Sequence, residues 1–224
     1  MIDLRRDGDV FILRMGNGEN RFSPEFLGAL QGALNEVAAA DGPRALVVTG
    51  TDKFFTNGLD LDWLGANPTR MGEYLDMVDD LFARVITMPC PTAAAINGHA
   101  FGAGAMLALC VDHRVMRTER GFWSLPEAAL SMPFTRGMAA LIRTRIPDGV
   151  ATEAILTSAR YDGDAAAAAG ILEEAVPAET LLDRARELAV ARAGLVGPNL
   201  AVIKRGLRLP LLDDLAVPTP PTLL

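Results

Sequence analysis

The sequence predicts an α/β fold that ends in a helical region, and three observations lead to this prediction. Short apolar runs typical of buried strands alternate with amphipathic stretches typical of helices through the first two thirds of the chain. Helical periodicity then dominates the last third. The length of 224 residues and the apolar fraction of 50% allow one domain with a full hydrophobic core.

Strands are predicted where short apolar runs stand between turn residues, at residues 10–14, 45–49, 92–96 and 114–116. The first of these strands leads into a turn at residues 16–18, where two glycines flank an asparagine. Helices are predicted where apolar residues recur every three or four positions, at 24–40, 74–87, 102–109, 137–144, 151–158, 181–193 and 199–207. Ser23 and Pro24 are typical of a helix start. The prolines at 218, 220 and 221 predict a frayed tail.

Composition excludes several classes of function. The 21 basic and 28 acidic residues leave a net charge of −7, whereas nucleic-acid binding needs a basic patch. The longest apolar run, at residues 100–111, is too short to span a membrane and contains glycines. The N-terminus has no apolar stretch typical of a signal peptide, so we expect a soluble cytoplasmic protein. Cys90 and Cys110 are too few for a disulfide framework, and we expect both to be buried.

Two glycine-containing loops could expose backbone N–H groups. Gly98, Gly102 and Gly104 lie between a predicted strand and a predicted helix. Unpaired N–H groups at the positive end of a helix suit an oxyanion, although such a turn can also serve only to pack the helix on a sheet. Residues 54–61 follow another predicted strand, and Gly58 permits an unusual turn that would expose its neighbours' amides.

One carboxyl group stands in apolar surroundings. Glu127 follows Phe122, Trp123 and Pro126 in the sequence. Desolvation would raise the pKa of such a carboxyl group and bring it closer to working pH as a base. The alternative is a solvent-facing glutamate that begins a helix after the proline.

Three segments, residues 54–60, 91–109 and 120–133, together resemble the crotonase superfamily, the enoyl-CoA hydratase/isomerase fold, within a match over residues 10–141. The run at 97–106 is most similar to the Δ3,Δ2-enoyl-CoA isomerases. The resemblance implies a spiral of repeated ββα units over residues 1–165. It also implies a helical region over residues 166–224 that takes part in oligomerisation.

The resemblance further implies an acyl-CoA substrate and assigns roles to individual residues. The backbone amides of Leu59 and Ala103 would hold the oxygen of a thioester enolate, and Glu127 would be the catalytic acid and base. The implied substrate-binding residues are Asn57, Gly58, Asp60, Leu61, Phe101, Gly102, Met106 and Trp123.

The glutamates decide which reaction is expected. Hydratases of this superfamily use two, and the first of the two positions is occupied here by Met106, which cannot hold water. A single base in an apolar pocket suits a proton shuttle, so Glu127 would take the C2 proton of a 3-enoyl-CoA and return it at C4. The alternatives are another crotonase reaction, such as hydration or thioester hydrolysis, and a non-catalytic acyl-CoA-binding protein.

The same reading implies a place in fatty acid β-oxidation, no metal, and no cofactor, because coenzyme A is part of the substrate. A homotrimer or a dimer of trimers is expected, without nucleic acid or membrane as partner. Coenzyme A is anionic, so a local patch must offset the net charge. Only two of the 21 basic residues are lysines, so we expect arginines to form this patch.

Overall fold

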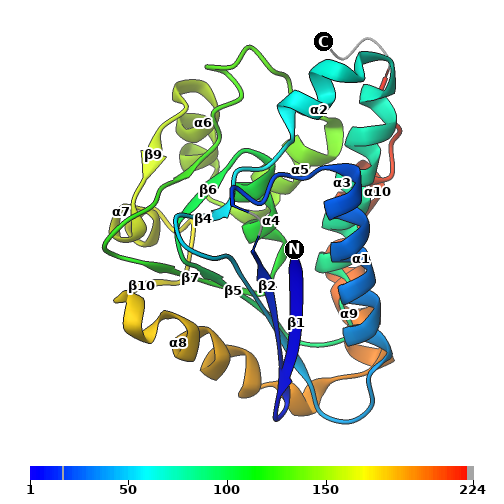
Figure 1. Cartoon of the computed structure of the whole chain (residues 1–224), viewed down its shortest axis with the longest axis vertical. Helices are drawn as coiled ribbons and strands as arrows, with labels where there is room; N and C mark the ends of the chain where they lie inside the picture. The colour runs from blue at the N-terminus through cyan, green and yellow to red at the C-terminus, as the bar shows by residue number, and fades with distance from the viewer. Residues whose placement is uncertain (17, 221–224) are drawn as a thin grey trace.

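Two β-sheets form the framework of the computed structural model, which describes residues 1–16 and 18–220 (Figure 1). The larger sheet has the strand order β1-β2-β3-β5-β7-β10. Its strands are β1 (Ile2–Asp7), β2 (Val10–Met15), β3 (Ala45–Thr49), β5 (Thr92–Ile96), β7 (His113–Arg117) and β10 (Glu174–Val176). The smaller sheet consists of β4 (Phe54–Thr56), β6 (His99–Phe101), β8 (Trp123–Ser124) and β9 (Arg160–Tyr161). All neighbouring strands are parallel except the pairs β1–β2 and β8–β9.

A ββα unit repeats along the chain. Three times, a strand of the larger sheet is followed by a strand of the smaller sheet and then by a helix or helices. The helices are α1 (Pro24–Ala39), α2 (Leu61–Ala66), α3 (Met71–Ile86), α4 (Ala103–Cys110), α5 (Arg136–Arg145), α6 (Asp148–Thr157), α7 (Gly163–Ala168), α8 (Ala178–Val190), α9 (Pro198–Leu207) and α10 (Leu209–Leu215). Short 3-10 turns lie at Pro68–Arg70 and Ala193–Leu195. The predicted α/β spiral of ββα units is therefore confirmed.

Helices cover both faces of the larger sheet. Ala45 and Val47 of β3 belong to the apolar cluster that includes Ala185 and Ala189 of α8, which lies along the lower face in Figure 1. Their neighbours on β3 point the other way, into the main core with α1, α3 and α4. Because both faces are covered, β3 and β5 are buried throughout and mostly apolar, which is why their sequence pattern was recognisable.

The predicted long elements are confirmed, and the missed ones are short or polar. Ser23 accepts a hydrogen bond from the Phe26 N–H (3.2 Å), as expected of the residue that caps α1. Strand β1 escaped prediction because it is an edge strand with polar, exposed residues. The strands of the smaller sheet have only two or three residues and lie inside segments that look like loops.

Two predictions about the end of the chain need correction. The boundary between residues 165 and 166 falls inside α7, and β10 pairs with β7, so the later segment also contributes to the larger sheet. Thr219 is buried and its N–H donates to the Asp76 carboxylate (2.8 Å), so the tail is held against α3 at this residue rather than frayed from residue 218 onwards. Pro221 of the predicted tail and the central residue of the 16–18 turn lie outside the described residues.

The expectations about the cysteines and about membrane-spanning segments can be compared with the structure. Cys90 and Cys110 are both buried and unpaired, as predicted. In the two described ranges, no helix combines the length and apolar character that crossing a membrane requires.

A buried carboxyl group connects α3 to α5. Asp79 is 1% exposed and accepts a hydrogen bond from the Thr135 hydroxyl (2.8 Å), which in turn caps α5 by accepting from the Met138 N–H (3.0 Å). The other oxygen of Asp79 has no partner among the described residues. The pKa of Asp79 is raised to about 7, mainly by burial; the Thr135 hydrogen bond opposes this shift, and the charges of Asp76 and Asp80 add to it.

We expect Asp79→Asn to stabilise the protein above neutral pH. The folded state holds a proton on Asp79 that the unfolded chain releases from about pH 4, so wild-type stability falls as the pH rises from there towards 7. The variant should lose this decline and gain roughly 1–2 kcal/mol at pH 8, measured by urea unfolding at several pH values. Glu36→Gln, at an exposed position of α1, is the matched control. Equal pH profiles for Asp79→Asn and wild type would contradict this interpretation.

Candidate active site

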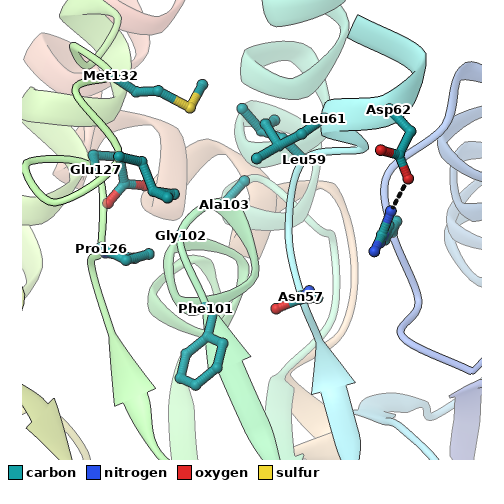
Figure 2. A pocket seen from close by; sticks show the side chains of 12 residues that line it. Asn57, Leu59, Leu61, Asp62, Phe101, Gly102, Ala103, Pro126, Glu127 and Met132 are labelled. Carbon is teal, nitrogen blue, oxygen red and sulfur yellow. Dashed lines mark hydrogen bonds and ion pairs between the residues drawn. The ribbon is translucent and has the colours of Figure 1, made fainter. Parts of the chain in front are cut away.

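A cavity of about 400 Å³ opens where the loop after β4, the turn before α4 and the segment after β8 meet (Figure 2). Seven of the predicted site residues line it: Asn57, Leu59, Leu61, Phe101, Gly102, Ala103 and Glu127. Because β4, β6 and β8 are neighbouring parallel strands, the segments that follow them emerge at the same edge of the smaller sheet. The predicted segments are therefore brought together by strand order.

The first backbone amide belongs to Leu59, and Gly58 determines where it lies. Gly58 has a φ of +77°, and a Cβ there would lie 2.6 Å from the Phe101 carbonyl oxygen and 2.9 Å from the Ala103 nitrogen. The loop is held from both sides, since the Gly58 N–H donates to the Thr56 hydroxyl (3.1 Å) and the Asp60 N–H to the Tyr74 hydroxyl (2.8 Å). Only glycine allows this loop to lie directly against the turn before α4.

The second amide belongs to Ala103, the first residue of α4. Gly102 precedes it with a φ of +53° and provides no side-chain cap. In the described part of the chain, the N–H groups of Leu59 and Ala103 have no hydrogen-bond acceptor. The Ala103 N–H also stands at the positive end of the helix. Two free donors on closely packed segments can bind one oxyanion.

The carboxyl group of Glu127 lies over the same turn. Glu127 is 9% exposed, and one of its oxygens, Oε1, would be 3.0 Å from a Cβ on Gly102. The other oxygen, Oε2, is buried without a partner in the described structure. Burial raises the pKa of Glu127 to about 7, and a hydrogen bond from its own backbone N–H opposes the shift. The alternative of a solvent-facing glutamate at a helix start is wrong, because Glu127 is buried in a turn.

A second, smaller cavity lies behind Glu127. It shares Leu59, Ala103, Glu127 and Met132 with the outer cavity and is otherwise lined by apolar side chains. Met106, one of the predicted site residues, lines this inner cavity and is completely buried. Helix α4 therefore contributes a thioether, and no carboxyl group, to the cavity that Glu127 lines.

Three other predicted residues lie outside both linings. Gly58 is buried beneath the loop that presents Leu59. Asp60 caps α2 by accepting a hydrogen bond from the Trp63 N–H (3.2 Å). Trp123 is fully buried and donates from its indole nitrogen to the Ala105 carbonyl (3.1 Å), so it supports α4 from behind.

The sequence analysis missed the charged residues at the mouth of the cavity. Arg21 donates to Asp62 (2.6 Å) and to Glu19 (2.6 Å), and both Arg21 and Asp62 line the outer cavity. No local motif marks this pair, because its members are 41 positions apart in the sequence. The Phe22 N–H, which donates to the Gly58 carbonyl (2.8 Å), brings the two segments together.

Metal ligands do not gather here or elsewhere in residues 1–16 and 18–220. No group of three or more His, Cys, Asp or Glu side chains there could hold a metal ion.

Comparison with known proteins identifies the family of the chain. The model of the enoyl-CoA hydratase/isomerase family matches residues 7–204. The chain belongs to this family. It is 32% identical to enoyl-CoA delta isomerase 3 of Arabidopsis thaliana over 182 residues, which cover 78% of this chain and 76% of the relative.

Solved structures of the family have the same fold. An apo enoyl-CoA isomerase from Mycobacterium tuberculosis superposes with a TM-score of 0.88 at 28% identity, covering 96% of this chain and 93% of the other. An enoyl-CoA hydratase from Mycobacterium ulcerans gives a TM-score of 0.88 at 26% identity, covering 96% and 94%. Both reaction names occur among similar structures, so the choice of reaction must come from the site itself.

Gly58→Ala should destabilise the protein by about 2 kcal/mol or more, because it places a side chain at a positive φ and against the Phe101 carbonyl. Gly65→Ala is the matched control, since Gly65 lies in α2 with open space around its Cα. That change should be neutral or stabilise the protein by up to about 1 kcal/mol. Denaturant unfolding measures the free energy of unfolding of both variants. Equal changes in the two would contradict the prediction and show that the loop around Gly58 can move to accept a side chain.

Proposed function

We propose that this protein is a Δ3,Δ2-enoyl-CoA isomerase that uses Glu127 as its only acid and base. As a family member it acts on enoyl-CoA thioesters. The isomerase assignment depends on one observation: the buried α4 side chains that line the inner cavity with Glu127 are those of Ala103 and Met106, and neither is a carboxyl group. Glu127 is the single carboxyl group lining the described inner cavity. Asp62, the other acid in the outer cavity, is paired with Arg21 at the mouth.

Hydration needs a water molecule held and activated beside the double bond. A thioether is a weak acceptor and no donor, so Met106 cannot orient that water. The apolar surroundings exclude water, which would be the competing nucleophile. The enolate formed by loss of the C2 proton can then react only with a proton. This arrangement favours proton transfer over water addition.

The proposed reaction begins with the substrate thioester oxygen between the Leu59 and Ala103 N–H groups. Glu127 removes a proton from C2, and the electrons move towards the thioester oxygen, where the two donors stabilise the negative charge. The protonated Glu127 then delivers its proton to C4, and the double bond comes to rest between C2 and C3. A carboxyl group with a pKa near 7 can both take and return the proton near neutral pH.

The proposal also covers cofactors, the place of coenzyme A, the pathway and the assembly. Only Glu127 and the two amides act in it, so no metal or further cofactor enters the reaction. Asn57 and Leu61 line the outer cavity beside Arg21, where the polar part of coenzyme A would lie. A role in fatty acid β-oxidation in the cytoplasm and a trimeric assembly complete the proposal.

Glu127→Gln should lower kcat for conversion of 3-hexenoyl-CoA to trans-2-hexenoyl-CoA by about 10²–10⁴-fold, because the amide cannot carry the proton. Product formation is followed by chromatography, and trans-2-hexenoyl-CoA is supplied separately to test for hydration. The comparison variant is Asp62→Asn, which neutralises the other carboxyl group of the outer cavity. If Asp62→Asn lowered kcat as much as Glu127→Gln does, the assignment of Glu127 would be contradicted. Hydration by the wild type at a higher rate than isomerisation would contradict the assignment of the reaction.

A further inference from the structure

Arg21 is the one basic side chain that lines the outer cavity in the described part of the chain, and two carboxylates already hold it. Its Nη1 donates to Asp62 (2.6 Å) and its Nε donates to Glu19 (2.6 Å). The same oxygen of Glu19 also accepts a hydrogen bond from the Asn57 side chain (3.3 Å). The guanidinium group therefore has partners before any ligand arrives.

The ion pair of Arg21 with Asp62 joins two segments at the mouth of the cavity. Asp62 is in the first turn of α2, and Arg21 lies between β2 and α1. Figure 2 shows Asp62 on the opposite side of the cavity from Glu127. The side chain of Asp62 is 88% exposed and that of Arg21 is 37% exposed, so solvent ions reach this pair.

The charges at the mouth oppose the binding of an anion. Arg21 supplies one positive charge and its two partners supply two negative charges, in a chain whose net charge is −7. Coenzyme A carries phosphate groups, and a phosphate accepts the same paired hydrogen bonds from a guanidinium group as a carboxylate does. A CoA thioester and the carboxylates therefore compete for the same donors.

The two carboxylates differ in how firmly they are held. Glu19 is fixed by Asn57 as well as by Arg21, whereas Arg21 is the single partner of the Asp62 carboxylate among the described residues. Exposed ion pairs add little to stability, because water replaces the contacts when they open. Asp62 can therefore leave at little cost, while Glu19 keeps the guanidinium group in place.

We propose that Asp62 is an internal competitor of the coenzyme A phosphates: it occupies Arg21 in the free protein and gives it up when a CoA thioester binds. Asp62 thereby weakens the binding of substrate and product alike and favours product release. The inference rests on the proposed function in taking a CoA thioester as the ligand, and not in the choice of reaction.

Binding of hexanoyl-CoA, which has no double bond to move, tests the proposal by calorimetry. Asp62→Asn should lower Kd about three- to tenfold at about 20 mM NaCl and less than about twofold at about 0.5 M, because salt screens exposed charges.

Glu187→Gln is the matched control. Glu187 shares Arg184 (2.9 Å) with Glu174 (2.7 Å), so it is also one of two carboxylates on one arginine, and it lies on α8 outside the outer cavity. This variant changes the net charge equally, and its Kd should stay within about twofold of the wild-type value at both salt concentrations.

A double-mutant cycle separates competition for Arg21 from simple repulsion of the ligand by Asp62. Arg21→Gln alone should raise Kd at least about fivefold, because it removes the donors for phosphate. In the Arg21→Gln background, Asp62→Asn should give no gain, since no guanidinium group remains to be released. An equal gain in both backgrounds would show that Asp62 acts by repulsion alone and would overturn the proposal.

Two further results would overturn it. One is an unchanged Kd for Asp62→Asn at low salt. The other is a larger loss of binding for Arg160→Gln than for Arg21→Gln, which would place the phosphates at the opposite rim, where Arg160 lies over the Phe101 ring (5.8 Å).

Failure of the proposed function gives a different pattern. Binding that follows these expectations without isomerisation of any 3-enoyl-CoA would overturn the isomerase assignment and support this inference. No binding of hexanoyl-CoA by the wild type would overturn both.

Discussion

The close contact between Gly58 and the turn before α4 is the constraint on which the site depends. A side chain at Gly58 would overlap the Phe101 carbonyl and the Ala103 nitrogen, so the two loops touch through their backbones. Parallel pairing of β4 with β6 delivers both loops to one edge of the smaller sheet. The free N–H groups of Leu59 and Ala103 therefore belong to two loops that are held against each other through their backbones.

Two buried carboxyl groups, Glu127 and Asp79, illustrate different consequences of burial. Glu127 and Asp79 both have a pKa raised to about 7, and in each the loss of solvent is the main cause. Glu127 opens onto the cavities, where a carboxyl group that titrates near neutral pH can move a proton. Asp79 lines neither cavity and acts through Thr135 on the frame of α5. The unpaired oxygen of Asp79 lowers the stability of the fold, whereas the hydrogen bond that its other oxygen accepts from Thr135 stabilises the start of α5.

Much of this arrangement was predictable from the sequence, and the failures have physical reasons. Apolar strands buried on both faces and the capped helix at Ser23 are local signals, and the structure confirms them. The short strands of the smaller sheet carry no periodicity, and the Arg21–Asp62 pair forms only once distant segments meet. Trp123 belongs to a recognisable motif, but its role is to support α4 through the Ala105 carbonyl. Sequence motifs therefore located residues that line the cavity better than the charged pair beside them.

The central claim is that one shielded carboxyl group carries the proton from C2 to C4. The most direct test supplies 3-hexenoyl-CoA deuterated at C2 in ordinary water and measures the isotope at C4 of the first product by mass spectrometry and NMR. Glu127 is only 9% exposed, so its proton exchanges poorly with solvent, and we expect a substantial fraction of the deuterium to appear at C4. Product whose C4 carries only solvent hydrogen from the first turnovers would contradict the account and indicate a second, solvent-exchanging acid.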